Sequence, residues 1–332
     1  MAKTIRDIAK RAEVSVSTAS LALNGDARVK ADTRDRILRV ADELNYHRMR
    51  AARSLSSGRT WTLDVINPAI DAALTSSFNT RFLHGLHDTA RKAQYAVALK
   101  VVGDEAEALS TVEHLILERA TDGVILMNPS DNEALVEHLA ERAFPHVLLG
   151  RAANRQVRSV DNDNHAAADD ATDALLRGRP GPVLFLSGPE RHTFTVDRRE
   201  GYRRALARHG MEGEEIACVT DGTAEAARRQ VRALITDGAP FRSVLALSDV
   251  MAIGAMRGVR EAGRRVPDDV AVMGMNNDDL TEYTDPRLSS VELNAYQLGR
   301  RAADALLAAV RGNDHTPTRT IVPHALAPRE ST

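Results

Sequence analysis

Residues 4–25 read TIRDIAKRAEVSVSTASLALNG, and their spacing predicts two short helices joined by a tight turn. Thr4 and Asp7 have the spacing of a capping box, which predicts a helix start at residue 5. Apolar residues at positions 5, 8, 9 and 12 form one helical face, so the first helix should span Ile5–Ala12. Ser15 is a preferred N-cap for a second helix over Val16–Leu23, and Asn24-Gly25 supplies its end.

A third predicted helix, over Asp32–Asn45, carries Ile37, Val40, Ala41 and Leu44 on one apolar face. Two short helices across a tight turn, followed by a supporting helix, form a helix-turn-helix arrangement. In such units the second helix lies in the major groove of DNA. The start of the chain therefore predicts a nucleic-acid-binding unit.

The charge distribution agrees with that prediction. The chain has a net charge of −2, but its first 60 residues hold 13 Lys and Arg against 7 Asp and Glu, a net charge of +6. The remaining 272 residues carry −8. A basic head on an acidic body is typical of nucleic-acid contact through the head alone, although a solvated basic face that binds nothing has the same pattern.

Length and composition limit the other possibilities. A chain of 332 residues, of which 43% are hydrophobic, is expected to form two or three folded units. No apolar run approaches the roughly 18 residues that a membrane span needs, and charged residues near the start argue against a secretory signal. The single cysteine, Cys218, excludes an internal disulfide and a multi-cysteine metal site. We therefore expect a cytoplasmic protein with no membrane partner, no metal and no cofactor.

Residues 4–25 closely resemble the DNA-binding headpiece of the LacI/GalR (lactose-repressor) family of bacterial transcription regulators. The resemblance implies that Val16, Ser17 and Leu21 contact DNA bases. The third position is commonly Arg in the family, which grips guanine O6 and N7, whereas leucine can only pack on a thymine methyl. Leu21 could instead belong to the headpiece core. The resemblance also implies contacts with the DNA backbone by Thr4, Ser15, Ser20 and Asn24.

Residues 47–60 resemble the hinge of the same family, a short helix that is ordered on operator DNA and inserts an apolar wedge into the minor groove. By position, Leu55 would be that wedge and contact the bases, with Ala52 and Arg53 beside it in the groove. Many relatives have Pro-Asn where this chain has Arg48-Met49, and loss of the proline removes a fixed helix start. The alternative is a flexible linker with an isolated leucine.

The rest of the chain, residues 61–332, alternates short β-branched or apolar runs with amphipathic stretches. This alternation predicts an α/β fold with parallel sheets and helices on both faces. Strands are expected at 63–67, 95–100, 123–127, 146–149, 183–187, 216–219, 243–247, 270–275, 289–293 and 320–322. Helices are expected between most of them, at 78–94, 105–119, 133–142, 164–176, 198–209, 223–237, 250–262 and 295–311.

This body resembles the two-lobed, periplasmic-binding-protein-like core of the same family. The resemblance implies a headpiece at 1–46, a hinge at 47–60, and an effector-binding and dimerisation core at 61–332. Crossovers near 159–161, 288–291 and 318–322 would divide the core into a lobe of about 61–160 plus 290–322 and a lobe of about 161–289. Dimer contacts are expected along 78–94 and 250–262.

Ligands of open α/β sheets bind at the carboxyl ends of the strands, and in a two-lobed core these ends meet between the lobes. Arg198 stands in the family's Arg-x-x-Gly pattern, and its guanidinium can hold two hydroxyls or a carboxylate. The residues that match effector-binding positions are Phe78, Asn79, Asp161, Arg198, Ser248, Asp249 and Asn276. Each has a structural alternative: Asp249 is also a plausible N-cap, Asn276 could form a turn, and Phe78 could be ordinary core. Arg198 could also lie on a solvated helix face.

The resemblance implies a repressor that binds a palindromic operator as a dimer and responds to a small molecule, by default a carbohydrate. Many sugar-binding relatives have Asn and Asp where this chain has Ser248 and Asn276, so a purine or nucleoside effector stays open, as does activation rather than repression. No dinucleotide, P-loop, serine-hydrolase or zinc-protease motif is present, which argues against a carbohydrate- or nucleotide-processing enzyme with an appended head. A bacterial cytoplasmic location, in association with the nucleoid, is expected.

Overall fold

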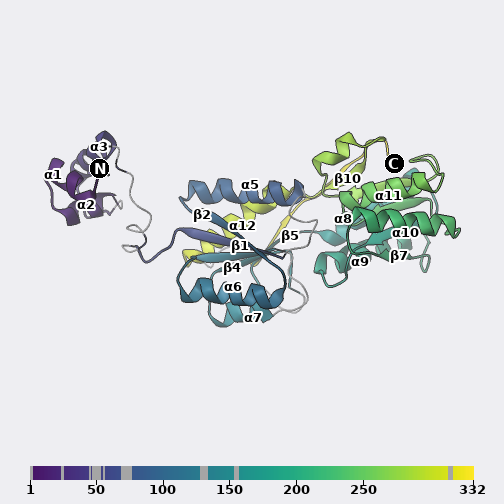
Figure 1. The fold of residues 1–332 in the computed structure, drawn as a ribbon, viewed down its shortest axis with the longest axis horizontal. Helices are drawn as coiled ribbons and strands as arrows, with labels where there is room; N and C mark the ends of the chain where they lie inside the picture. The colour runs from purple at the N-terminus through teal and green to yellow at the C-terminus, as the bar shows by residue number, and fades with distance from the viewer. Residues whose placement is uncertain are drawn as a thin grey trace. The chain divides into compact units, whose positions relative to one another are not determined.

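The computed structural model describes residues 3–23, 26–44, 46, 54, 57–68, 77–127, 134–152, 157–312 and 317–332. The chain divides into two compact units, Met1–Trp61 and Thr62–Thr332 (Figure 1). Among the described residues, no helix is long and apolar enough to cross a membrane.

The first unit contains the three expected helices, which are α1 (Ile5–Arg11), α2 (Val16–Leu23) and α3 (Ala31–Glu43). They enclose a small core in which Ile8, Ala19 and Ile37 are fully buried. Burial of these side chains holds the helices together, because each helix is too short to be stable alone in water. The helix-turn-helix prediction is confirmed.

Local capping explains where α1 and α2 begin. The Asp7 carboxylate accepts hydrogen bonds from the Thr4 N–H at 2.8 Å and from the Thr4 hydroxyl at 2.9 Å. Ser15 Oγ accepts from the Thr18 N–H at 3.0 Å, which makes Ser15 the N-cap of α2. The expected end of α2 at Asn24-Gly25 lies outside the described residues.

The second unit consists of two lobes, each built on one six-stranded sheet. The sheet of the first lobe has the order β11-β5-β4-β3-β1-β2 and is parallel throughout. Its strands are β1 (Thr62–Pro68), β2 (Ala96–Val102), β3 (Gly123–Met127), β4 (His146–Leu149), β5 (Ser159–Asn162) and β11 (Arg319–Val322). Figure 1 shows α5 (Ser77–Lys92) and α12 (Ala295–Val310) on one face and α6 (Glu105–Leu117) and α7 (Ala134–Glu141) on the other.

The sheet of the second lobe has the order β12-β10-β9-β8-β6-β7, and only β12 is antiparallel to its neighbour. Its strands are β6 (Val183–Ser187), β7 (Ile216–Val219), β8 (Ser243–Ala246), β9 (Ala271–Met275), β10 (Ser289–Glu292) and β12 (Ala325–Ala327). Its helices pack in pairs, α8 (Asn164–Gly178) with α9 (Thr193–Arg208) and α10 (Ala224–Thr236) with α11 (Asp249–Glu261). A short 3₁₀ helix, η2 (Asp279–Tyr283), follows β9.

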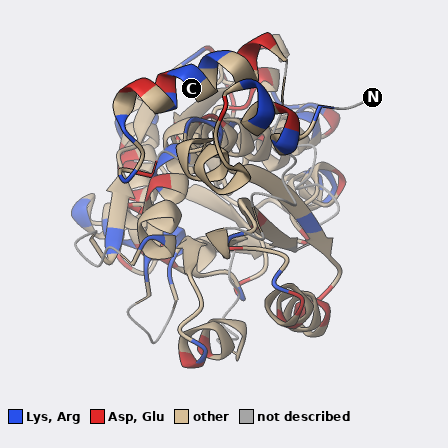
Figure 2. Cartoon of the chain, turned by 90° about the vertical axis from the view of Figure 1, so that its left-hand side faces the viewer, with Lys and Arg blue, Asp and Glu red and all other residues tan. Residues whose placement is uncertain are grey.

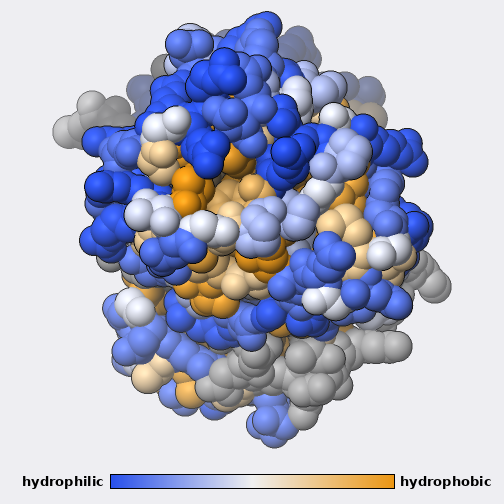
Figure 3. Space-filling view, turned by 90° about the vertical axis from the view of Figure 1, so that its right-hand side faces the viewer, coloured by the Kyte–Doolittle hydropathy of each residue, from blue (hydrophilic) through white to orange (hydrophobic). Residues whose placement is uncertain are grey.

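The surfaces of the two units are polar, as the composition leads one to expect. Acidic and basic residues are interspersed along the outer helices (Figure 2). Seen from the side of the second lobe, apolar residues reach the surface in a central area that hydrophilic residues surround (Figure 3). The α/β fold with parallel sheets is confirmed.

Two glycines allow α5 and α12 to pack against each other at short range. A Cβ atom added at Gly85 would lie 2.0 Å from the carbonyl oxygen of Tyr296, and one added at Gly299 would lie 2.0 Å from that of Phe82. No side chain fits at either position, so the two helices meet backbone to backbone. This contact fixes the direction of α5, whose first turn reaches the second lobe.

Three chain crossings join the lobes, between β5 and α8, between β10 and α12, and between β11 and β12. Asn162 lies where they meet. Its side-chain Nδ2 donates hydrogen bonds to the carbonyl oxygens of Leu293, at 3.0 Å, and Val322, at 2.8 Å. The buried side-chain amide of Asn162, on the first crossing, is therefore hydrogen-bonded to the backbone of the second and third crossings.

The lobe boundaries differ from those expected. Asp161 and Asn162 belong to β5 of the first lobe, although the boundary is expected after residue 160. Residues 289–292 form β10 of the second sheet, and β12, which the sequence pattern does not predict, returns the chain to the second lobe. The strands at 289–293 and 320–322 are present as β10 and β11, but β5 and β12 are not among the expected strands. Both are very short, and β5 ends in two polar residues, so an apolar pattern does not mark them. Helix α9 begins at Thr193 rather than Arg198, because the stretch 193–196 contains β-branched residues that do not signal a helix.

Candidate functional site

A cavity lies between the two lobes, at the carboxyl ends of strands from both sheets. This is the place where open α/β sheets bind ligands. Lining residues from the first lobe include Phe78, Asn79, Leu149, Gly150, Asp161 and Asn162. Lining residues from the second lobe include Asn164, His192, Phe194, Thr195, Arg198, Leu247, Ser248, Asn276 and Asp278. Six of the seven residues expected at an effector site therefore face this cavity.

Arg198 is the central cation of the cavity. Its side chain lies on α9 and the residue is only 6% exposed, so it does not occupy the solvated face of the helix. Nε donates to Asn164 Oδ1 at 2.9 Å, and Nη1 donates to the carbonyl oxygen of Leu247 at 2.9 Å. Burial lowers the pKa of Arg198 to about 10, which leaves the guanidinium charged at neutral pH. The remaining N–H groups are available to a ligand oxygen.

Asp161 is the acid nearest to this cation network. Its Oδ1 accepts hydrogen bonds from the Asn162 N–H at 2.8 Å and from Asn164 Nδ2 at 3.0 Å. Burial raises the pKa of Asp161 to about 6. Asn164 thus connects Asp161 to Arg198, and the three side chains form one hydrogen-bonded group on the wall of the cavity.

The start of α9 supplies lining residues that the sequence pattern did not indicate. The ring of Phe194 lies 5.3 Å from that of His192 in a stacked arrangement, and the Arg198 guanidinium lies 5.1 Å from the Phe194 ring centre. Thr195 is fully buried, and its Oγ1 makes no hydrogen bond to any described residue. A buried hydroxyl without a partner is costly, so a ligand that bonds to it gains from the site. If the sequence pattern had predicted that α9 begins at Thr193, Phe194 and Thr195 would have been expected on the same helix as Arg198.

Ser248 lines the cavity as expected and also takes the N-cap position considered for Asp249, whereas the effector contact expected of Asp249 is wrong. Ser248 is the N-cap of α11, with Oγ accepting from the Met251 N–H at 3.3 Å, and it lines the cavity. Asp249 does not line the cavity. It is fully buried and accepts hydrogen bonds from the Asp278 N–H at 2.7 Å and from the Ser290 hydroxyl at 2.5 Å. Burial raises the pKa of Asp249 to about 8.

Phe78, Asn79 and Asn276 take the positions expected of them at the cavity. Phe78 belongs to the first lobe and packs against the apolar core of the second, so the alternative of ordinary core burial also holds in part. Asn276 follows β9 with a φ of 112°, in the left-handed region that asparagine tolerates better than most residues. Asn276 therefore forms the turn after β9 and lines the cavity as well.

The headpiece residues expected to contact bases differ in exposure. Val16 is 45% exposed and Ser17 is exposed, whereas Leu21 is half-buried and packs against the headpiece core. Among the residues expected at the DNA backbone, Ser15 and Thr4 have hydroxyls engaged in caps, and Ser20 is half-buried. Asn24, Ala52, Arg53 and Leu55 lie outside the described residues. In the described part of the chain, no cluster of three or more His, Cys, Asp and Glu could hold a metal ion.

Comparison with known proteins identifies the family. Residues 4–48 match the description "Bacterial regulatory proteins, lacI family", and residues 182–332 match "Periplasmic binding protein-like domain". The chain is 31% identical to the HTH-type transcriptional regulator CelR of Thermobifida fusca, over 99% of this chain and 98% of that protein. The chain belongs to the lacI family of bacterial regulatory proteins. The lacI-family resemblance of the headpiece is thereby confirmed.

Solved structures of lacI-family regulators resemble the whole chain. The complex of the transcriptional regulator CelR with cellobiose matches with a TM-score of 0.77 at 27% identity, and covers 99% of this chain and 100% of that chain. The lac repressor dimer bound to operator and the anti-inducer ONPF matches with a TM-score of 0.84, over 100% and 99% of the two chains. At 23% identity the second likeness supports the fold alone.

Proposed function

We propose that this lacI-family chain is a repressor that binds a palindromic operator as a dimer and is controlled by a small polyhydroxylated effector. The observation that carries the proposal is the pairing, in one chain, of a capped helix-turn-helix unit with a cavity between two lobes. The cavity holds a buried guanidinium, on Arg198, and a buried hydroxyl, on Thr195, that meets no described partner. A site of this kind is built to be filled by a polar ligand.

The carbohydrate class is supported by the mixture of surfaces in the cavity. Arg198, Thr195 and Ser248 offer donors and acceptors to hydroxyl groups, while Phe78 and Phe194 offer apolar ring faces to C–H groups. The relative CelR has been solved as a cellobiose complex, which supports the same class. The second candidate is a nucleoside, which is favoured by the aromatic stack at Phe194 and by Asn276, whose amide can pair with a base edge.

Dimerisation would place two headpieces on two half-sites, which is why we expect a palindromic operator. The effector would act by binding the operator-bound and free states unequally, since a ligand with equal affinity for both shifts neither. We place the protein in the bacterial cytoplasm on the nucleoid, and we propose regulation rather than catalysis as its role. Activation instead of repression would reverse only the sign of the effector's coupling.

The test begins with DNA. The purified protein is incubated with random duplex DNA at about physiological salt, because phosphate contacts make affinity depend on ionic strength, and the retained DNA is sequenced. Enrichment of a palindrome supports the proposal, and a pool without any enriched sequence contradicts it. Cellobiose, related mono- and disaccharides and nucleosides are then screened for release of that operator.

Arg198→Ala is the decisive variant for the cavity, with Arg199→Ala as its matched control. Arg199 lies next to Arg198 but pairs with Glu190 and Glu215 away from the cavity. Truncation of a buried charged group that bonds a ligand costs roughly 2–5 kcal/mol. We therefore expect Arg198→Ala to weaken effector binding by at least about thirtyfold and to keep operator binding. An unchanged effector titration in calorimetry would remove Arg198 from the site.

A further inference from the structure

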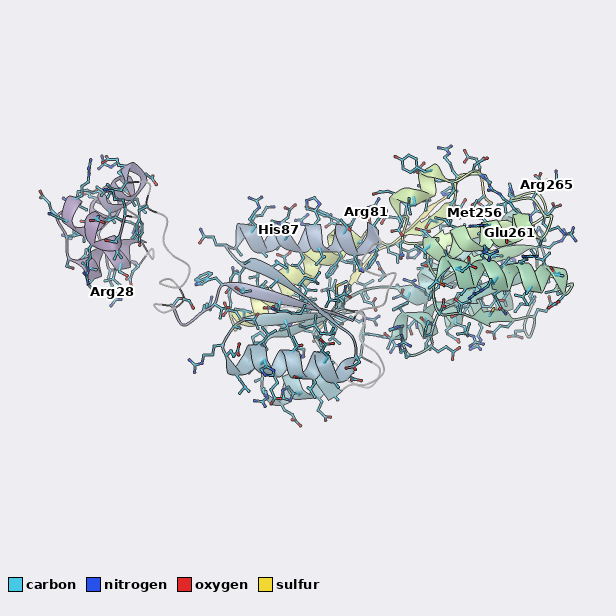
Figure 4. All side chains as sticks on the ribbon, in the orientation of Figure 1. Arg28, Arg81, His87, Met256, Glu261 and Arg265 are labelled. Atoms are coloured by element: carbon cyan, nitrogen blue, oxygen red, sulfur yellow. The ribbon has the colours of Figure 1, made fainter. Side chains whose placement is uncertain are left out.

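The first turn of α5, in the first lobe, is held by the loop that follows β9 in the second lobe. The Phe78 N–H donates to Asp278 Oδ1 at 3.1 Å, and Arg81 Nη1 donates to the carbonyl oxygen of Asn277 at 3.0 Å. Arg81 also forms an ion pair with Asp279. Figure 4 labels Arg81 at the end of α5 that faces the second lobe. These contacts join the lobes at one lip of the cavity.

Asp278 and Asp279 are adjacent acidic residues that differ in their exposure to solvent and in their position at the cavity. Asp278 is 2% exposed and lines the cavity, whereas the Asp279 side chain is 72% exposed and does not line it. The first N–H groups of a helix have no partner within the helix, and the positive end of the helix dipole favours a carboxylate there. Asp278 therefore caps α5 from the opposite lobe, in a place protected from solvent.

The loop that carries Asp278 is fixed to the second lobe. The Asp278 N–H donates to Asp249 Oδ2 at 2.7 Å, and the Asn277 N–H donates to Ser290 Oγ at 3.0 Å. Asn276 and Asn277 both have positive φ, at 112° and 52°, which turns the chain sharply after β9. Because its backbone is held in this way, the Asp278 carboxylate moves with the second lobe.

We propose that Asp278 is a positioning residue that holds the two lobes closed around the cavity before any effector binds. A second side-chain contact also joins the lobes, in which Arg151 of the first lobe donates from Nε to Asp197 Oδ2 of the second at 2.8 Å. Oδ2 of Asp278 makes no hydrogen bond to a described residue, so an effector hydroxyl can bind it without displacing Phe78. An effector in the cavity then further stabilises a closed arrangement of the lobes that Asp278 already holds.

This inference rests on the proposed function for the identity of the cavity as an effector site, but its test uses neither effector nor DNA. Hydrogen exchange of the Phe78 amide is measured in the full-length protein, by mass spectrometry with fragmentation to single amides. In the wild type this amide should be protected. Asp278→Ala should speed its exchange about fivefold, the size expected for loss of a side-chain helix cap. Asp278→Asn keeps an acceptor oxygen and should stay close to the wild type.

Asp279→Ala is the matched control, because it removes the exposed ion pair with Arg81 and leaves the cap in place. An exposed pair contributes little, so exchange at Phe78 should change less than twofold. Equal acceleration by Asp278→Ala and Asp279→Ala, or an unprotected Phe78 amide in the wild type, would overturn the proposal.

Closure itself is measured by an interlobe disulfide. The Asp279 N–H lies 3.4 Å from Ser77 Oγ, so Ser77→Cys with Asp279→Cys, in a Cys218→Ser background, places one thiol on each lobe. The disulfide should form rapidly when Asp278 is present and about fivefold more slowly when it is alanine. Equal rates would show that Asp278 does not hold the lobes together. If the alanine variant does not fold, the rate with Asp278 intact still decides, because slow disulfide formation there overturns the proposal. Because operator selection is a separate measurement, failure here leaves the proposed function standing.

Discussion

We expect a single side chain, Leu21, to decide which base the headpiece reads at the third predicted position. Leu21 is half-buried against the headpiece core, so it offers DNA only part of an apolar surface. Leu21→Arg would keep the aliphatic stem in place and add a guanidinium fork that suits guanine O6 and N7. We expect the preferred half-site to move toward guanine at one position, by about 1–3 kcal/mol of discrimination. The same half-site in a repeated binding-site selection would show that residue 21 does not read a base.

Asp161 makes the stability of the core depend on pH. Its pKa is raised by burial to about 6, from 3.8, so the folded state binds a proton more tightly than the unfolded state does. That contribution to stability is fully present below the unfolded pKa and is lost as the pH rises through the folded pKa. Asp161→Asn removes the titration and keeps the oxygen that accepts from Asn162 and Asn164.

The free energy of unfolding of the wild type should therefore fall, relative to Asp161→Asn, by about 3 kcal/mol as the pH rises from below 4 to above 6. Urea unfolding at several pH values across this range measures the difference. Parallel curves for the two proteins would mean that Asp161 titrates normally. Burial also raises the pKa of Asp249, to about 8, so Asp249 makes stability fall over the same range. Both proteins contain Asp249, so the difference between their curves isolates Asp161.

At the scale of elements, the direct backbone contact of α5 with α12 sets the position of the α5 first turn. Gly299→Ala puts a methyl group 2.0 Å from the Phe82 carbonyl oxygen, where neither helix can yield without moving the other. We expect a loss of about 3 kcal/mol in the free energy of unfolding, at the upper end of the range for overpacking. Urea unfolding measures it.

Gly178→Ala is the matched control for that substitution. Gly178 is the last residue of α8, and a Cβ atom there meets nothing within 4 Å. Removal of a glycine from a helix position without crowding should stabilise the protein by about 0.5 kcal/mol. Equal effects of the two substitutions would show that the α5–α12 contact can be relaxed at no cost.

The elements themselves could largely be predicted from the sequence, because most carry an apolar period that burial in one core requires. The headpiece helices and strands such as β3 and β6 follow that rule. Strand β5, at the first crossing, does not: it contains Asp161 and Asn162, whose side chains serve the cavity and the other crossings rather than an apolar face. Phe194 and Thr195 line the cavity but could not be predicted there, because they lie in the first turn of α9, where β-branched residues do not indicate a helix.

At the scale of the whole molecule, Asn162 is the residue that all three crossings share. Its two hydrogen bonds, to Leu293 and Val322, tie the second and third crossings to the first, and its own N–H is bonded to Asp161. A change of lobe angle must pass through these crossings. Loss of the amide should therefore affect the coupling between effector and operator more than either binding event alone.

Asn162→Ala tests that expectation. Ser248→Ala is the control, because it removes a cavity hydroxyl that is bonded to the Met251 N–H and not to a crossing. Asn162→Ala should leave operator affinity within about twofold of the wild type and reduce effector-induced release by at least about tenfold, since coupling energies between sites are about 1–3 kcal/mol. Ser248→Ala should weaken effector binding while saturating effector still releases the operator. Operator titrations with and without saturating effector measure both quantities. If saturating effector still releases the operator fully from Asn162→Ala, the lobes transmit the effector's signal by another path. If only operator affinity is lost, Asn162 contributes to the stability of the core and not to its response to the effector.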